Sequence, residues 1–152
     1  MSAGRLILAM LVFLPVSADA AILGSCAIVV NRDGTMRPNP AVDVLSSRAA
    51  GGSAALVTVS ANSLLCSLLN LLDCYSVSAP APASFAASPQ GAGTGVTFSS
   101  AYSLDGAAEK PGATATRVAN GAHSLAIQLE ATRAGGIFPS GSYEAVVTVR
   151  CE

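Results

Sequence analysis

The sequence predicts an all-β fold, an antiparallel β-sandwich, from three observations. Short runs rich in β-branched residues recur at a spacing of about ten residues. Gly, Pro, Asn and Ser, which suit turns, fill the gaps between these runs. The last run alternates, so that one face carries Tyr143, Ala145, Val147, Val149 and Cys151. We therefore expect residues 138–152 to form a half-buried terminal strand.

The remaining strands follow from the same patterns. The expected strands cover residues 26–30, 41–45, 55–59, 75–79, 96–98, 102–104, 116–118 and 125–129. Pro38 and Pro40 place the 41–45 strand at a sheet edge, because proline cannot donate to a ladder. Asp33-Gly34 predicts a turn with positive φ, and Asn120-Gly121 predicts a hairpin that joins 116–118 to 125–129.

A leucine-rich segment, residues 63–74, interrupts the strand pattern. On a continuous helix Cys66 and Cys74 would lie about 12 Å apart along the axis, beyond the reach of a disulfide. We therefore expect a short helical or hairpin insertion that folds over one end of the core. The alternative is an exposed patch for a partner or a membrane. The candidate interaction patch consists of Leu68, Leu69, Leu71, Leu72, Phe85 and Tyr102.

The first 20 residues have the pattern of a secretory signal peptide. Arg5 precedes an apolar run that is too short to span a bilayer, and small residues flank the expected cleavage after Ala20. We expect a single β-sandwich domain over residues 21–152, secreted, periplasmic or at the cell surface of a Gram-negative bacterium. The alternative is an outer-membrane lipoprotein acylated at Cys26, because Leu23-Gly24-Ser25-Cys26 resembles a lipobox.

The composition excludes several classes of function. The chain has 8 basic and 9 acidic residues among 152, so it offers no basic patch for nucleic acid and no polybasic anchor. No spacing of Ser, His and Asp suggests a hydrolase, and the lone His123 predicts neither a catalytic base nor a zinc site. We expect no enzymatic activity, no cofactor and no metal.

The four cysteines allow three pairings. Cys66 with Cys74 needs only local folding, and Cys26 with Cys151 would then close almost the whole domain. We expect these two bonds. The runner-up pairs Cys26 with Cys74, as between the first core strands of many secreted sandwiches. Export favours disulfides in either case.

Several of these segments together suggest a family. Cys26, the Gly34 turn, residues 45–47 and 51–55, and the close from Phe138 to Cys151 resemble small secreted bacterial proteins of the spore coat U and archaic chaperone-usher pilin group. The resemblance implies an immunoglobulin-like sandwich and a role at the surface or in a fibre. Residues 21–25 are too few for a donor strand, since strands run about five to ten residues. We therefore expect this domain to close its own sheet.

The function expected from the sequence is that of an exported, non-enzymatic structural or surface protein, related to pilin subunits and stabilised by disulfides. Its partners would be other surface or pilus subunits. The alternative is a secreted module that binds a glycan or a host protein through its loops.

Overall fold

The computed structural model describes residues 24–63 and 75–152, and this part of the chain is all-β. No helix long and apolar enough to cross a membrane occurs in these two ranges. The strands are β1 (Ser25–Arg32), β2 (Arg37–Pro38), β3 (Val44–Ser46), β4 (Ala55–Asn62), β5 (Tyr75–Ser78), β6 (Val96–Leu104), β7 (Lys110–Pro111), β8 (Thr116–Val118), β9 (Gly121–Arg133) and β10 (Arg150–Cys151).

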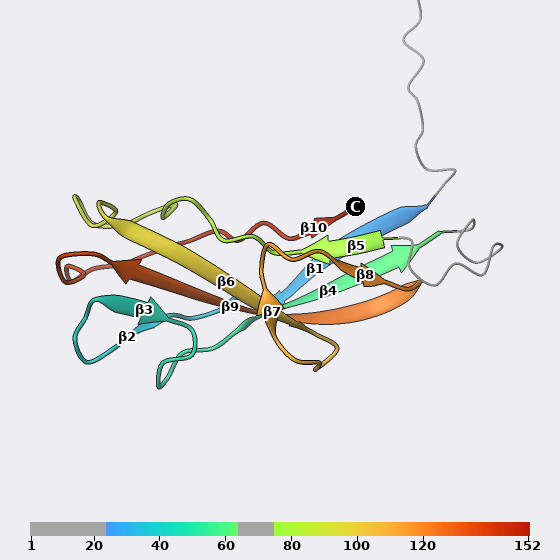
Figure 1. Cartoon of the computed structure of the whole chain (residues 1–152), viewed down its shortest axis with the longest axis horizontal. Helices are drawn as coiled ribbons and strands as arrows, with labels where there is room; N and C mark the ends of the chain where they lie inside the picture. Colours follow the sequence, from blue (N-terminus) through green and yellow to red (C-terminus); the bar gives the residue numbers. More distant parts are fainter. Residues whose placement is uncertain (1–23, 64–74) are drawn as a thin grey trace, which may run out of the picture.

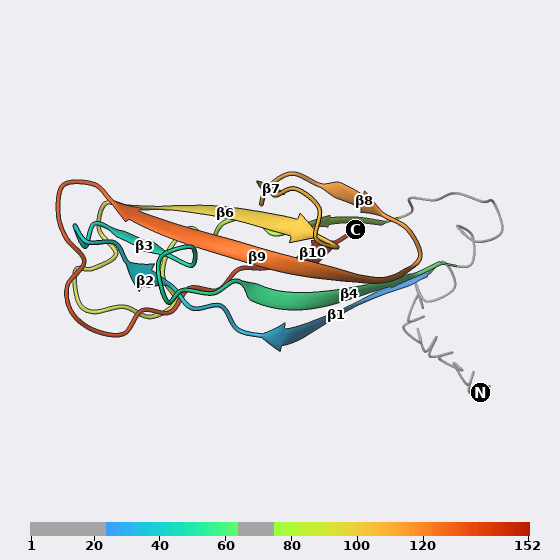
Figure 2. The same cartoon turned by 90° about the horizontal axis from the view of Figure 1, so that it is seen from below.

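The larger sheet is organised around the 13-residue strand β9. Along one edge β9 pairs first with β4, which in turn pairs with β1, and then with β3, which pairs with β2. Along its other edge β9 pairs with β6, and β6 pairs with β7. All of these pairs are antiparallel, and the long central strand β9 runs through the sheet in both views (Figures 1 and 2).

The smaller sheet has the order β10-β5-β8 and shares a core with the larger one. Side chains from β4, β6 and β9 pack there against side chains from β5 and β8. The largest fully buried side chains are Tyr102, Leu125, Val59 and Val77. Burial of such side chains contributes about 1.5–3 kcal/mol each, so this cluster is the main source of stability.

The hydroxyl of Tyr102 joins the two sheets. It donates to a backbone carbonyl and lies within hydrogen-bond distance of Val77 O at 3.1 Å, Thr114 O at 2.8 Å and Thr116 Oγ1 at 2.5 Å. A buried hydroxyl without a partner would be costly, and here every neighbour belongs to β5, to β8 or to the segment leading into β8. Tyr102 therefore fixes the position of the smaller sheet over β6.

Gly112 allows a second close approach between the sheets. Its N–H donates to Ser100 O and its carbonyl accepts from Ala79 N, both at 2.8 Å. A Cβ at this position would overlap Ser100 Oγ and Ala79 O. The backbone of residue 112 thus lies between two strands with no room for a side chain.

Several expected elements differ in the structure. Residues 96–98 and 102–104 belong to one strand, β6, because residues 99–101 continue its ladder with β9. The strand after Pro40 begins only at Val44 and is not an edge, since β3 lies between β9 and β2. Gly34 has no positive φ, and the chain continues extended to a bridge between Thr35 and Ser53.

The expectation of a hairpin at Asn120-Gly121 is also wrong. The two residues do join β8 to β9, but β8 pairs with β5 and β9 pairs with β4 and β6. The turn is therefore a corner at which the chain passes from the smaller sheet to the larger one. The Asn120 side chain accepts from Ser63 N at 3.0 Å and donates to Ser63 O at 2.9 Å, which ties this corner to the end of β4.

Candidate functional site

The described residues form an apolar cavity of about 950 Å³ that opens at one edge of the molecule. We call it the edge groove. One side is formed by β1 and the loop after it, and the other by residues 139–149; β4 and β9 form its floor. Most side chains that line it are apolar, among them Ile28, Val30, Val57, Ile127, Leu129, Val147 and Val149.

The first wall of the groove is a strand with a free edge. Within the described residues β1 pairs only with β4, so the other edge of β1 has no ladder partner. Three consecutive aliphatic residues on it are well exposed: Ile28 at 40%, Val29 at 55% and Val30 at 61%. No charged residue interrupts Ser25 to Asn31. Proteins usually protect such edges with charges, prolines or a covering segment; among the described residues, β1 has one charge, Arg32 at its end, and no proline.

The second wall is an extended segment, residues 145–149, that lacks a ladder. Alternate residues are half-buried and exposed, as in a strand, but no backbone hydrogen bond joins them to any other described residue. Pairing exists only at the two ends, between Glu144 and Ala87 and between β10 and β5. The chain that faces them between these pairs contains Pro80 and Pro82, which have no N–H to donate.

The groove is held at one end by a disulfide. Cys26 in β1 and Cys151 in β10 are bonded, with their Cα atoms 6.3 Å apart. This is the pairing that the sequence analysis favoured, and it excludes a pairing of Cys26 with Cys74. It also contradicts the lipoprotein alternative, because the sulfur that a lipid would occupy is bonded to Cys151.

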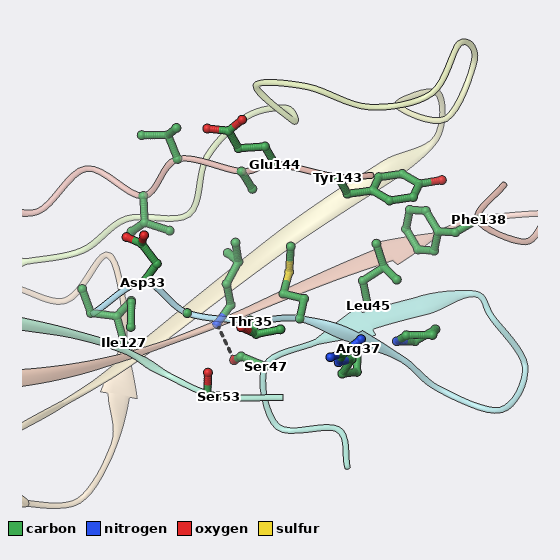
Figure 3. Close-up of a pocket in the computed structure, with 18 of the residues that line it drawn as sticks. Asp33, Thr35, Arg37, Leu45, Ser47, Ser53, Ile127, Phe138, Tyr143 and Glu144 are labelled. Carbon is green, nitrogen blue, oxygen red and sulfur yellow. Dashed lines mark hydrogen bonds between the residues drawn. The ribbon is translucent and has the colours of Figure 1, made fainter. Parts of the chain in front are cut away.

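The groove ends at its other side in an aromatic cluster. Phe85 lies at its centre, with ring centroids 4.8 Å from Phe98, 5.1 Å from Tyr143 and 6.1 Å from Phe138. The Tyr143 hydroxyl donates to Pro139 O at 2.6 Å. Figure 3 shows Tyr143 and Phe138 together at this end, with Leu45 beside them. The cluster anchors the start of the second wall.

Charged side chains stand at the rim of the groove rather than on its floor. Glu144 immediately precedes the second wall, Asp33 follows β1, and Arg37 begins β2 (Figure 3). All three residues are exposed. The interior of the groove is therefore suited to apolar groups, and a polar or charged group on a bound molecule would face outward.

Val42, which lines the groove near the aromatic cluster, has a φ of +57°. This conformation is an outlier for a β-branched residue. The turn around it is fixed by Asn39, whose side chain donates to Asp43 Oδ1 at 2.7 Å and accepts from Val44 N at 3.2 Å. Val42 O accepts from Phe138 N at 2.7 Å, so the strained turn positions the segment that enters the second wall.

Of the candidate interaction patch, only two residues can be compared with the structure. Tyr102 is wholly buried and its hydroxyl is occupied within the core, so it is not an interaction residue. Phe85 is half-buried in the aromatic cluster and acts as an anchor. Leu68, Leu69, Leu71 and Leu72 lie outside the described residues, as do Cys66, Cys74 and residues 1–20.

His123 takes part in a polar clasp away from the edge groove. Its Nδ1 lies 2.7 Å from Asp105 Oδ2 and its Nε2 lies 3.0 Å from Ala119 O. Both partners are acceptors, so the imidazole satisfies both contacts only when both nitrogens carry a proton. The hydrogen bond that His123 donates to the Asp105 carboxylate raises the pKa of His123, and the same bond, followed by that from Ser124 N, lowers the pKa of Asp105.

This clasp has a structural role. Neither nitrogen of His123 is directed at a nucleophile, and Asp105 Oδ1 accepts from Ser124 N at 2.8 Å. Asp105 itself has a φ of +51°, in the turn that follows β6. The clasp therefore holds that turn against the start of β9.

In comparisons with known proteins, the chain matches no family model, no curated protein and no solved structure.

Proposed function

We propose that this protein is an exported, non-enzymatic structural or surface subunit that accepts an extended strand from a partner chain in the edge groove. In this view the fold is an immunoglobulin-like sandwich that lacks one strand. The observation that carries the proposal is the apolar groove between two extended segments, β1 and residues 145–149, which both lack a ladder partner on the groove side.

A strand in the groove would satisfy backbone and side chains together. Its N–H and C=O groups can pair with β1 on one side and with residues 145–149 on the other, as in β-strand addition. Its alternate side chains would enter the apolar interior beside Val30 and Val147. The distance from Tyr143 to Val149 is six residue steps, or about 20 Å, so the groove accommodates about six or seven residues.

The proposal departs from the expectation that the domain closes its own sheet. That expectation depended on the few residues before Cys26 and did not consider whether the domain could accept a strand. Among the described residues, β1 has no ladder partner besides β4. The disulfide is compatible with an oxidising compartment outside the cytoplasm, where a surface subunit would assemble.

Peptide binding tests the proposal. The probe is a synthetic ten-residue peptide with Val or Ile at every second position and Thr, Ser or Lys between them. Its control has the same sequence with N-methyl groups on alternate amides, which removes backbone donors and leaves the side chains in place. We expect calorimetry to detect binding of the first peptide and at least tenfold weaker binding of the second.

A matched pair of variants locates the binding. Val30→Lys places a charge in the groove, whereas Ile137→Lys changes a similarly exposed aliphatic residue, 64% against 61%, that does not line it. We expect Val30→Lys to weaken binding at least tenfold and Ile137→Lys to leave it unchanged. Equal binding of both peptides, or equal effects of both variants, would contradict strand acceptance. Specific binding on a glycan array without peptide binding would favour the alternative, a ligand-binding module.

A further inference from the structure

The disulfide joins β1, the first wall of the edge groove, to β10, which directly follows the second wall. Cys26 precedes Ile28 by two residues and Cys151 follows Val149 by two, so by strand alternation both sulfurs point to the same side as the residues that line the groove. Both cysteines pack against the main core. The bond therefore lies where the first wall begins and the second wall ends.

Apart from this bond, the second wall is held at that end by the packing of Val147 and Val149 against the main core and by a short ladder. Residues 145–149 have no backbone hydrogen bonds to other described residues. Beyond them β10 has only two residues, and Glu152 exchanges two hydrogen bonds with Ser76, of 2.6 and 3.0 Å. A ladder of two or three residues opens readily unless other contacts hold it. In the described part of the chain, the disulfide at Cys151 is the one covalent cross-link between residues 145–152 and another strand.

We propose that the Cys26–Cys151 disulfide is a redox latch on the edge groove, an inference that rests on the proposed strand acceptance. When the bond is intact, residues 145–149 lie opposite β1 and the groove can accept a strand. When the bond is reduced, β10 detaches from β5, the second wall leaves its position and strand binding is lost. The main core, which is built mostly by β4, β5, β6, β8 and β9, stays folded.

The chemical step is an exchange with a dithiol reductant such as dithiothreitol. One thiolate of the reductant attacks a sulfur of the disulfide, and the second thiol resolves the mixed disulfide. Two electrons and two protons pass to Cys26 and Cys151, which become thiols, and the reductant is oxidised to its own disulfide. In an oxidising compartment the reverse exchange restores the latch.

Binding of the ten-residue alternating peptide, measured with and without dithiothreitol, tests the latch. We expect reduction to weaken binding at least tenfold. Hydrogen exchange on the same samples gives an independent readout. The amides of Ser76, Ser78, Arg150 and Glu152, which face each other across β5 and β10, should lose protection on reduction, while those of residues 125–131 in β9 keep it.

Two variants separate the latch from general stability. Val118→Ala destabilises the main core but keeps the disulfide, and Val118 does not line the groove, so this variant should bind the peptide like the parent protein. In the second variant, Cys26→Ser and Cys151→Ser are combined with Ser76→Cys and Glu152→Cys. Residues 76 and 152 form a hydrogen-bonded pair, whose Cα atoms typically lie about 5.5 Å apart, within disulfide range. This second link should restore binding and make it sensitive to reduction again.

The outcomes distinguish the two proposals. If the oxidised protein does not bind the peptide, strand acceptance fails and the latch fails with it. If the oxidised and reduced proteins bind equally, strand acceptance stands and the latch is wrong. The latch is also wrong if Val118→Ala loses binding in proportion to its stability, or if the relocated disulfide forms, the protein is folded, and binding does not return.

Discussion

The main core and the edge groove share strands β4 and β9 but differ in how completely their polar groups are paired. In the main core β5 and β8 cover β4, β6 and β9, and the buried Tyr102 hydroxyl has partners in the covering segments. In the edge groove β1 and residues 145–149 present apolar side chains and unpaired backbone to an open space. The main core is covered on both faces. The edge groove is apolar like a protein interior, but no described strand covers it.

The difference between the two regions comes from a few residues. Pro80 and Pro82 prevent the segment after β5 from pairing fully with the C-terminal segment. From Ser25 to Asn31, the opposite edge of β1 has no charge or proline that would discourage a new neighbour. An apolar groove between free strand edges is therefore a property of the local sequence as well as of the topology.

Hydrogen exchange should show the largest contrast. Amides of β9 from Leu125 to Ala131 lie in a paired central strand, whereas those of residues 145–149 have no acceptor among the described residues. We expect exchange rates that differ by a factor on the order of 10³ or more, because paired core amides exchange only through larger openings. Mass spectrometry of the oxidised protein measures this. Equal protection would mean that the second wall has a partner.

A matched pair of truncations should separate the regions by stability. Leu125→Ala removes a fully buried side chain and should lower the free energy of unfolding by about 2–5 kcal/mol. Ile28→Ala removes a side chain that is 40% exposed in the groove and should cost less than about 1.5 kcal/mol. Denaturant unfolding under non-reducing conditions provides both values. Similar costs at the two positions would show that the groove is packed like the core.

Tyr102→Phe tests the polar link between the sheets. The variant keeps the ring but leaves Val77 O, Thr114 O and Thr116 Oγ1 without the hydroxyl, and this should cost about 1–3 kcal/mol. Tyr143→Phe is the control, because its hydroxyl donates to Pro139 O at an exposed position. We expect a cost below about 0.5 kcal/mol for the control. A reversed order of these two effects would contradict the assignment of Tyr102 to the core.

The clasp between His123 and Asp105 should give the smallest effect, about 0.5–1 kcal/mol for a partly exposed pair. The folded pKa of His123 is raised, so its contribution is complete below its ordinary pKa of 6.5 and is lost as the pH rises through the folded value. The folded pKa of Asp105 is lowered, so its contribution is present above 3.8 and is lost as the pH falls through its folded value.

Unfolding of the parent protein and of His123→Gln from pH 4 to pH 9 measures this dependence. The difference in free energy should be greatest between about pH 4 and 6.5 and should shrink at higher pH. A difference that grows above pH 7 would show that the neutral imidazole is the stabilising form.

The local patterns predicted the all-β class, which is confirmed, and the face of the last segment. Alternation from Tyr143 to Cys151 is visible in the sequence and in the burial of these residues, because side-chain direction depends only on the extended backbone. The missing ladder was not predicted, since it depends on Pro80 and Pro82 lying beside that segment. Asn120-Gly121 similarly signals a turn but does not reveal that its two strands enter different sheets.

The site itself was largely invisible in the sequence. Tyr102 was assigned to a surface patch because aromatic residues often mark binding sites, but nothing local shows that three oxygens surround its hydroxyl. The uncharged run from Ser25 to Asn31 was the available signal for the groove. A strand of that composition belongs either in the interior or at an edge that will be covered.

The close packing around Gly112 has a consequence for mutations at this residue. Every single-nucleotide missense change of a glycine codon introduces at least a Cβ, and at residue 112 that atom has no space between Ser100 and Ala79. Alleles with a substitution there should yield less folded protein, most clearly at raised temperature, although the groove residues are untouched. Such alleles would mark Gly112 as a position on which the supply of the protein depends.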